Sequence, residues 1–237
     1  MRNSRKTRMA TFLLTGGLLT LASGVAAAES LDGQVLGGGK PVANSTVTLW
    51  AAGSTAPRQL AQTRTDAEGH FAFGSVAAPG SGASLYLTAK GGHSGADKTE
   101  GDNPALAFLA VMGSQPPSHV TISEMTTVAS VWTHAQFIDG AAIKGHALGL
   151  RIAAGNVLNF VDLQTGGWGE PIQDPLNSGQ TPTMANFATL ADLLAGCATR
   201  VAPEACPKLF ADAAPPFVTI FGRFWSGRAT SFGFFTA

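Results

Sequence analysis

The chain has 237 residues, with 15 Lys or Arg against 15 Asp or Glu, so its formal net charge is zero. Four of the basic residues and none of the acidic ones fall in the first 28 positions, so the rest of the chain is mildly acidic, with 11 basic against 15 acidic residues. It holds no cluster of Lys or Arg, which argues against a nucleic-acid partner.

Residues 1–28 have the features of an export signal. A basic head is followed by an apolar run at 12–21, and Ala26-Ala27-Ala28 offers a cleavage site. The apolar run is shorter than the roughly 20 residues of a membrane-spanning helix. We therefore expect a secreted or periplasmic protein with no transmembrane span after cleavage; an uncleaved anchor is the alternative.

Residues 29–122 show short alternating stretches separated by turns. The turn Asp66-Ala67-Glu68-Gly69 is the clearest, since Asp bonds its own backbone and Gly tolerates positive φ. The spacing predicts an antiparallel β-sandwich of seven strands. The expected strands are 31–36, 45–51, 60–65, 70–76, 84–89, 105–112 and 119–122.

Residues 123–138 predict an amphipathic helix that joins the strands to a second unit, with Ser123 as its N-cap and Thr121 as the alternative. We expect its apolar face to pack inward and its polar face to lie opposite. The expected apolar face comprises Met125, Val128, Ala129, Val131, Trp132, Ala135 and Ile138. The expected polar face comprises Thr126, Ser130, Thr133 and His134.

The segment 123–214 predicts a helical unit of three to four helices, which makes the fold class α+β. After the first helix, a second is expected at 145–162 and a third at 181–199, where Thr181-Pro182 is a start signal. A loop at 163–180 holds Trp168, and a short fourth helix follows at 204–212.

Cys197 and Cys206 are the two cysteines of the chain. In an oxidising compartment a pair this close most simply forms a disulfide, here joining the third and fourth helices. A metal site would need two further ligands, and no nearby His supplies them.

The first half resembles the carboxypeptidase regulatory-like domain. The resemblance rests on Gly33-Gln34-Val35, on 40–47 and on the run 65–71 that ends at Phe71. It implies a prealbumin-like β-sandwich, often grouped with carbohydrate-binding-like folds, in an accessory role. Phe71 would be a core residue.

The second half resembles an uncharacterised segment of secreted bacterial proteins, through Glu124-Met125-Thr126-Thr127-Val128-Ala129, Pro182-Thr183 and the two cysteines. Some such proteins continue into a propeller of the streptogramin-lyase-like sort. Residues 215–237 depart from that pattern. Their abrupt aromatic bias is interpreted as a frame-shifted or disordered tail, with an edge strand or a partner-binding patch as alternatives.

Motifs that would carry catalysis are lacking. The segment 92–96 breaks the G-x-S-x-G pattern, the Gly37-Gly38-Gly39-Lys40 run lacks the other residues of a phosphate loop, and no H-E-x-x-H occurs. We therefore expect no metal, no cofactor and no catalytic residue. The acidic residues Asp97, Glu100 and Asp102 are interpreted as a solvated loop rather than a calcium site.

These observations favour a non-enzymatic exported protein that binds a polysaccharide or another cell-envelope protein. By fold analogy the ligand would be a carbohydrate, stacked on Trp50, Tyr86 or Trp168. The alternative is that the chain is the N-terminal part of a larger propeller-containing protein with lyase-like activity. A third hypothesis is an enzyme that uses His134 in a cleft lined by Thr127 and Ser130; a packed or solvated helix surface is preferred to it.

Overall fold

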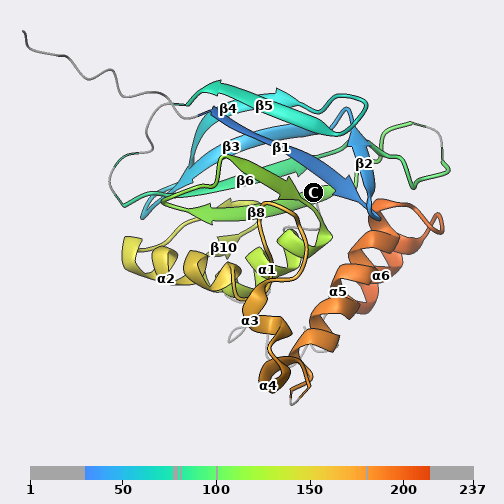
Figure 1. The fold of residues 1–237 in the computed structure, drawn as a ribbon. Helices are drawn as coiled ribbons and strands as arrows, with labels where there is room; N and C mark the ends of the chain where they lie inside the picture. The colour runs from blue at the N-terminus through green and yellow to red at the C-terminus, as the bar shows by residue number, and fades with distance from the viewer. Residues whose placement is uncertain (1–29, 77–79, 81, 100, 180, 214–237) are drawn as a thin grey trace, which may run out of the picture.

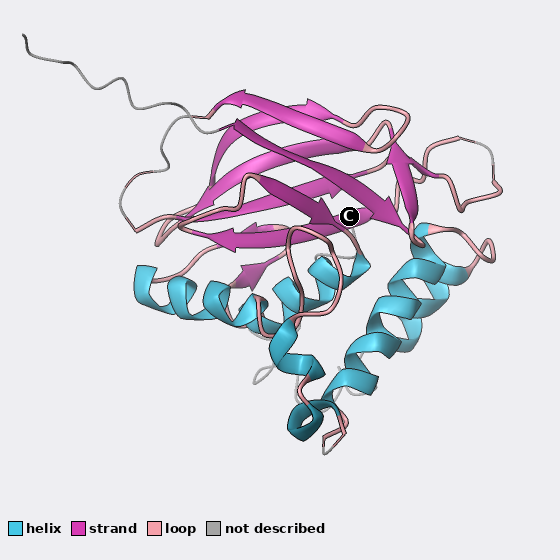
Figure 2. Cartoon of the chain, in the orientation of Figure 1, coloured by secondary structure: helices cyan, strands magenta, loops and turns pink. Residues whose placement is uncertain are grey.

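A computed structural model describes residues 30–213, apart from 77–79, 81, 100 and 180. Over this range the fold is α+β, with strands in the first half and helices in the second (Figures 1 and 2). The predicted export signal at 1–28 and the aromatic tail at 215–237 lie outside the described residues.

Two open sheets are built from nine strands. In the first sheet, β1 pairs with β5, β2 and β9, and β2 pairs in turn with β7. These strands are β1 (Ser30–Gly37), β2 (Lys40–Ala43), β5 (His70–Ser75), β7 (His93–Ser94) and β9 (His119–Ile122). The second sheet has the order β4 (Arg58–Arg64), β3 (Thr46–Ala52), β6 (Ser84–Lys90), β8 (Ala107–Gly113).

All seven predicted strands occur, but the expected seven-stranded, fully antiparallel arrangement is wrong in two respects. The sheets also contain β2 and β7, which are too short to show a hydrophobic period. In addition, β1 and β9 run parallel, with Asp32 opposite His119. Local alternation cannot reveal the direction in which two distant strands pair.

The strands β6 and β8 of the second sheet are covered on both faces. Leu49, Leu87 and Phe73 belong to one core between the two sheets, and the helices lie beneath the opposite face of β6 and β8 (Figure 1). All residues of β6 from Ser84 to Ala89 are buried as a result. Burial on both faces also explains the continuous apolar run of β8.

The described residues form six helices and a small hairpin instead of the expected three to four helices. The helices are α1 (Glu124–His134), α2 (Ala147–Val157), α3 (Glu170–Gln173), α4 (Pro175–Ser178), α5 (Thr183–Ala198) and α6 (Ala205–Ala213). The hairpin pairs β10 (Ile138–Asp139) with β11 (Ala142–Ile143). None of the described helices is long and apolar enough to cross a membrane.

One feature of the helical half follows the sequence prediction, and one does not. The predicted Cys197–Cys206 disulfide is present and links α5 to α6. The one-turn helices α3 and α4 lie in the segment predicted to be a loop. In α2, Leu148 and Ile152 are exposed, while Leu150 and Val157 are buried.

The orientation expected for α1 is wrong. Ser123 caps the helix as predicted, but the buried side chains include Thr126, Thr127, Ser130 and His134, each 0% exposed. Trp132 is 42% exposed, and Ile138 leaves the helix for β10. Val128 and Ala129 are buried as expected.

The polar face of α1 is buried because it binds the free edge of β8. The backbone N–H of Leu109 donates to Thr127 Oγ1 at 3.0 Å, and that of Val111 donates to Ser130 Oγ at 2.9 Å. Thr127 Oγ1 itself donates to the carbonyl of Ser123 at 2.6 Å. The hydroxyls thus satisfy strand groups that would otherwise be buried without partners.

We predict that Thr127→Val lowers the free energy of unfolding by about 1–3 kcal/mol, because it leaves the Leu109 N–H buried and unpaired at nearly constant volume. Urea denaturation measures the loss. The matched control is Thr189→Val, whose exposed hydroxyl bonds only the carbonyl of Ala185 in its own helix. Equal stability of the two variants would contradict the role given to the α1 hydroxyls.

Candidate functional site

An open hollow of about 470 Å³ lies on the outer face of the first sheet. Along β1, Leu31, Gly33 and Val35 are buried, so Asp32 between them points outward. The register places Asp32 opposite Ala72 of β5 on one side and opposite His119 of β9 on the other. The hollow is lined by Asp32, Gly33, Arg64, Asp66, His70, Phe71, Ala72 and His119.

The hollow exists because short and long side chains alternate across this surface. Ala72 contributes only a methyl group between the longer Asp32 and His70. Beneath it, Phe71 is 3% exposed and closes the floor against the core. The result is an apolar base ringed by polar groups, as in many small-ligand sites.

Two carboxylate–imidazole pairs stand at the rim. Asp32 Oδ1 lies 2.5 Å from His119 Nδ1, and both side chains are about half exposed. Since a carboxylate accepts, the Nδ1 proton of His119 points to Asp32. The Asp66 carboxylate accepts from the backbone N–H of Glu68 at 3.0 Å and of His70 at 2.7 Å.

Arg64 supplies the permanent positive charge of the hollow. Its Nη1 donates to Asn44 Oδ1 at 2.5 Å, and Asn44 Nδ2 donates to Asp102. Asn44 has φ 60°, a left-handed conformation that Asn tolerates well. Among the described residues Arg64 forms no ion pair, so its other donors are free for a ligand.

This arrangement is suited to hydrogen bonding with a polar molecule. Carboxylates accept, the guanidinium donates, and the imidazoles do either. The lining residues that the structure describes include no Ser, Thr, Cys or Lys to act as a nucleophile. Over the described ranges, no three His, Cys, Asp or Glu side chains are placed to hold a metal ion.

The aromatic residues singled out from the sequence lie elsewhere. Tyr86 is 1% exposed, burial raises its pKa to about 12, and its Oη accepts from the Ile143 N–H at 3.5 Å. Trp50 is half-buried and stacks on Tyr86 with ring centroids 6.2 Å apart. Trp168, also half-buried, packs on Phe187 at 5.4 Å.

The sequence contained part of the signal for the hollow. Alternation along β1 and β5 places Asp32 and His70 outward, and residues 66–69 predict the turn between β4 and β5. What the sequence lacked was the parallel pairing of β9 with β1, which brings His119 beside Asp32. Arg64 joins them because the turn 65–69 folds β4 back against β5, with Asp66 N bonded to the His70 carbonyl at 3.0 Å.

The acidic loop after β7 is structural where it is described. The buried Asp97 carboxylate pairs with Arg200 of the segment after α5. Arg200 also donates to the carbonyls of Thr99 and Gly101, and the Asn103 amide donates to those of Cys197 and Ala198. Glu100 lies outside the described residues.

His134, the titratable group of the third hypothesis, is packed inside the protein. Its Nδ1 lies 3.1 Å from the Ser130 carbonyl, and its Nε2 is buried without a partner among the described residues. Burial lowers its pKa from 6.5 to about 4, and the Ser130 carbonyl opposes that shift in part. The imidazole is therefore neutral in the folded protein near pH 7.

We predict that His134 makes the protein less stable in acid. Between pH 6.5 and about 4 the unfolded chain binds a proton at His134 that the folded chain does not, so the free energy of unfolding falls as pH falls, by about 3 kcal/mol in total. Denaturation of wild type and His134→Gln from pH 7.5 to 4 tests this. The stability difference between them should change with pH; a constant difference would contradict the buried neutral imidazole.

Comparison of the chain with protein-family models, with curated proteins and with solved structures found no match to any of the three. The case for a function therefore rests on the geometry of the hollow and of the surface around it.

Proposed function

We propose that the protein is an exported, non-enzymatic binding or accessory module that holds a carbohydrate in the hollow. The observation that carries the proposal is the meeting of the Asp32–His119 pair, Asp66 and the unpaired Arg64 around one apolar floor. Sugar hydroxyls both donate and accept, so they suit a rim that offers carboxylate acceptors and guanidinium donors side by side. The pyranose face suits the floor.

Export is supported by the signal-like residues 1–28 and by the disulfide, which persists in oxidising compartments. We further propose that the two sheets are a variant of the prealbumin-like sandwich, enlarged by β2 and β7. Folds of this kind host accessory binding domains, and fold analogy alone leaves the ligand open. A polysaccharide or a glycosylated cell-envelope component is the partner we propose.

The test is binding to a panel of immobilised polysaccharides and glycans. We predict that wild type binds at least one of them and that Asp32→Asn weakens this binding roughly tenfold or more, because the amide replaces an acceptor by a donor and releases His119. The half-exposed position of Asp32 makes the change nearly neutral for stability.

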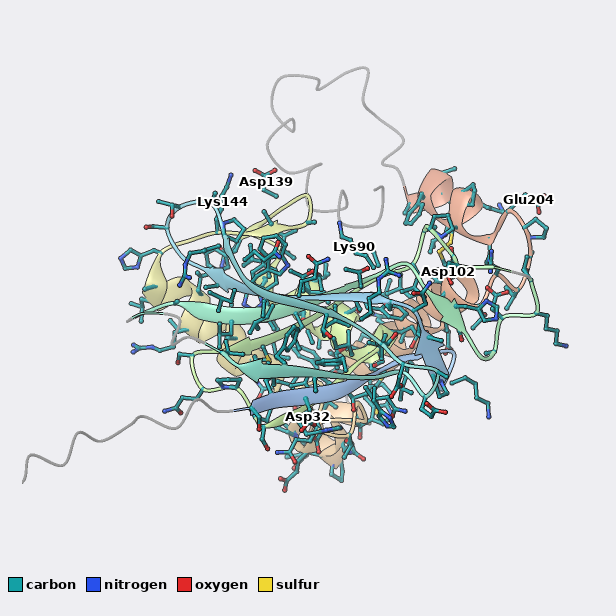
Figure 3. The ribbon with its side chains drawn as sticks, turned by 90° about the horizontal axis from the view of Figure 1, so that it is seen from above. Asp32, Lys90, Asp102, Asp139, Lys144 and Glu204 are labelled. Carbon is teal, nitrogen blue, oxygen red and sulfur yellow. A yellow bond between two sulfur atoms is a disulfide. The ribbon has the colours of Figure 1, made fainter. Side chains whose placement is uncertain are left out.

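The matched control is Asp139→Asn. Asp139 forms an equally exposed ion pair with Lys144 on the β10–β11 hairpin, and Figure 3 shows it on the side of the molecule away from Asp32. Asp139→Asn should bind like wild type. Absence of binding to every glycan, or equal effects of the two variants, would overturn the proposal.

A further inference from the structure

We infer that the aromatic tail, residues 215–237, docks on an exposed leucine seam of α5 in the same chain. The seam is the side of α5 that carries Cys197, Leu193 and Leu190. The tail would then be a binding patch, as in one of the alternatives for this segment, with its partner in the same chain. The seam belongs to the helical layer and is separate from the hollow on the first sheet (Figure 1).

The seam is a continuous stripe along α5. Leu190 and Leu193 are three residues apart, and Leu193 and Cys197 are four apart, so the three side chains are neighbours on one side of the helix. Cys197 is buried, whereas Leu190 and Leu193 are 42% and 46% exposed. The apolar stripe therefore begins under cover and continues into solvent, as expected of a face that another segment packs against.

Helix α6 covers the seam only at the end that carries the disulfide. The Cys197–Cys206 bond fixes the start of α6 against the end of α5, with the two Cα atoms 4.7 Å apart. Cys206 is buried there together with Cys197. Since α6 has nine residues and α5 has 16, most of the length of α5 extends beyond this contact. The two leucines lie in that part.

The chain leaves α6 within reach of the leucines. Cys206 and Ala213 are seven residues apart on α6, a length of about 10 Å. Cys197 and Leu190 are separated by the same number on α5. At any angle between the two helices, Ala213 and Leu190 are then at most about 25 Å apart, which about eight extended residues bridge. The chain continues for 24 residues after Ala213, so the tail is long enough.

The composition of the tail fits this surface. It contains six of the 14 Phe residues of the chain together with Trp225, and burial of such rings on leucine side chains is favourable. Its charged residues are Arg223 and Arg228, whereas residues 163–213 contain five acidic and two basic residues, so the two segments carry opposite net charge. Because the tail is attached beside the seam, its effective concentration there exceeds that of a second molecule.

Trypsin tests the docking, because it cleaves after Arg and reaches a docked segment only when that segment is released. We expect Leu193→Asp to raise the rate of cleavage after Arg228 roughly tenfold over wild type, since it places a charge in the seam. Phe221→Ser should raise it similarly from the side of the tail, without any change in the helices. Mass spectrometry of the full-length protein follows the cleavage.

Leu148→Asp is the matched control. Leu148 is 50% exposed on α2, and α1 lies between α2 and α5 (Figure 1). This variant should be cleaved after Arg228 at the wild-type rate.

Equal cleavage of wild type, Leu193→Asp and Phe221→Ser would overturn the inference, as would an equal acceleration by Leu148→Asp. Protection that rises with protein concentration, together with a dimer mass in light scattering, would also overturn it, because a second copy of the chain would then occupy the seam.

Discussion

The structure depends on two hydrogen bonds between the edge of a sheet and the side of a helix. Leu109 and Val111 of β8 donate to Thr127 and Ser130 of α1, where another strand would otherwise be needed. Thr127 and Ser130 are three residues apart on one face of α1, with Cβ atoms about 5–6 Å apart, so their hydroxyls can reach two N–H groups about 6.6 Å apart on the strand edge. The free edge of β8 is thereby hydrogen-bonded inside the protein without a further strand.

This contact also positions the hollow, although it lies on the other side of the second sheet. The chain passes directly from β9 through Ser123 into α1, so fixing α1 on β8 fixes the end of β9. β9 in turn carries His119 against β1, and the loop after α2 covers its other edge, where the Thr121 N–H donates to the Leu163 carbonyl at 2.8 Å. Glu124 provides a second link between α1 and the first sheet. Its buried carboxylate accepts a hydrogen bond at 2.7 Å from the N–H of Gly38, in the turn after β1.

The sequence predicted what is local and missed what depends on distant partners. The strands, the Asp66 turn, the Ser123 cap and the disulfide follow from alternation, turn chemistry and spacing. The face of α1 could not be predicted, because its Thr and Ser side chains are buried only when a strand edge needs acceptors. Trp132, the largest apolar residue of that helix, is left half-exposed beside Phe160 for the same reason. The hollow was missed because it combines residues of β1, β9 and the turn after β4.

Much of the sheet surface is covered by the core and the helices, and this limits the places where a ligand can bind. The inner faces of the two sheets form the core, and the helices cover β6 and β8 from the other side. The outer face of β1, β5 and β9 stays open, and the hollow lies there. Asp32, His70 and His119 occur there on strands, and the Asp32–His119 pair links β1 to β9. Side chains on such a support lose little freedom on binding, so each contact to the ligand proposed above would add to the affinity instead of offsetting an ordering cost.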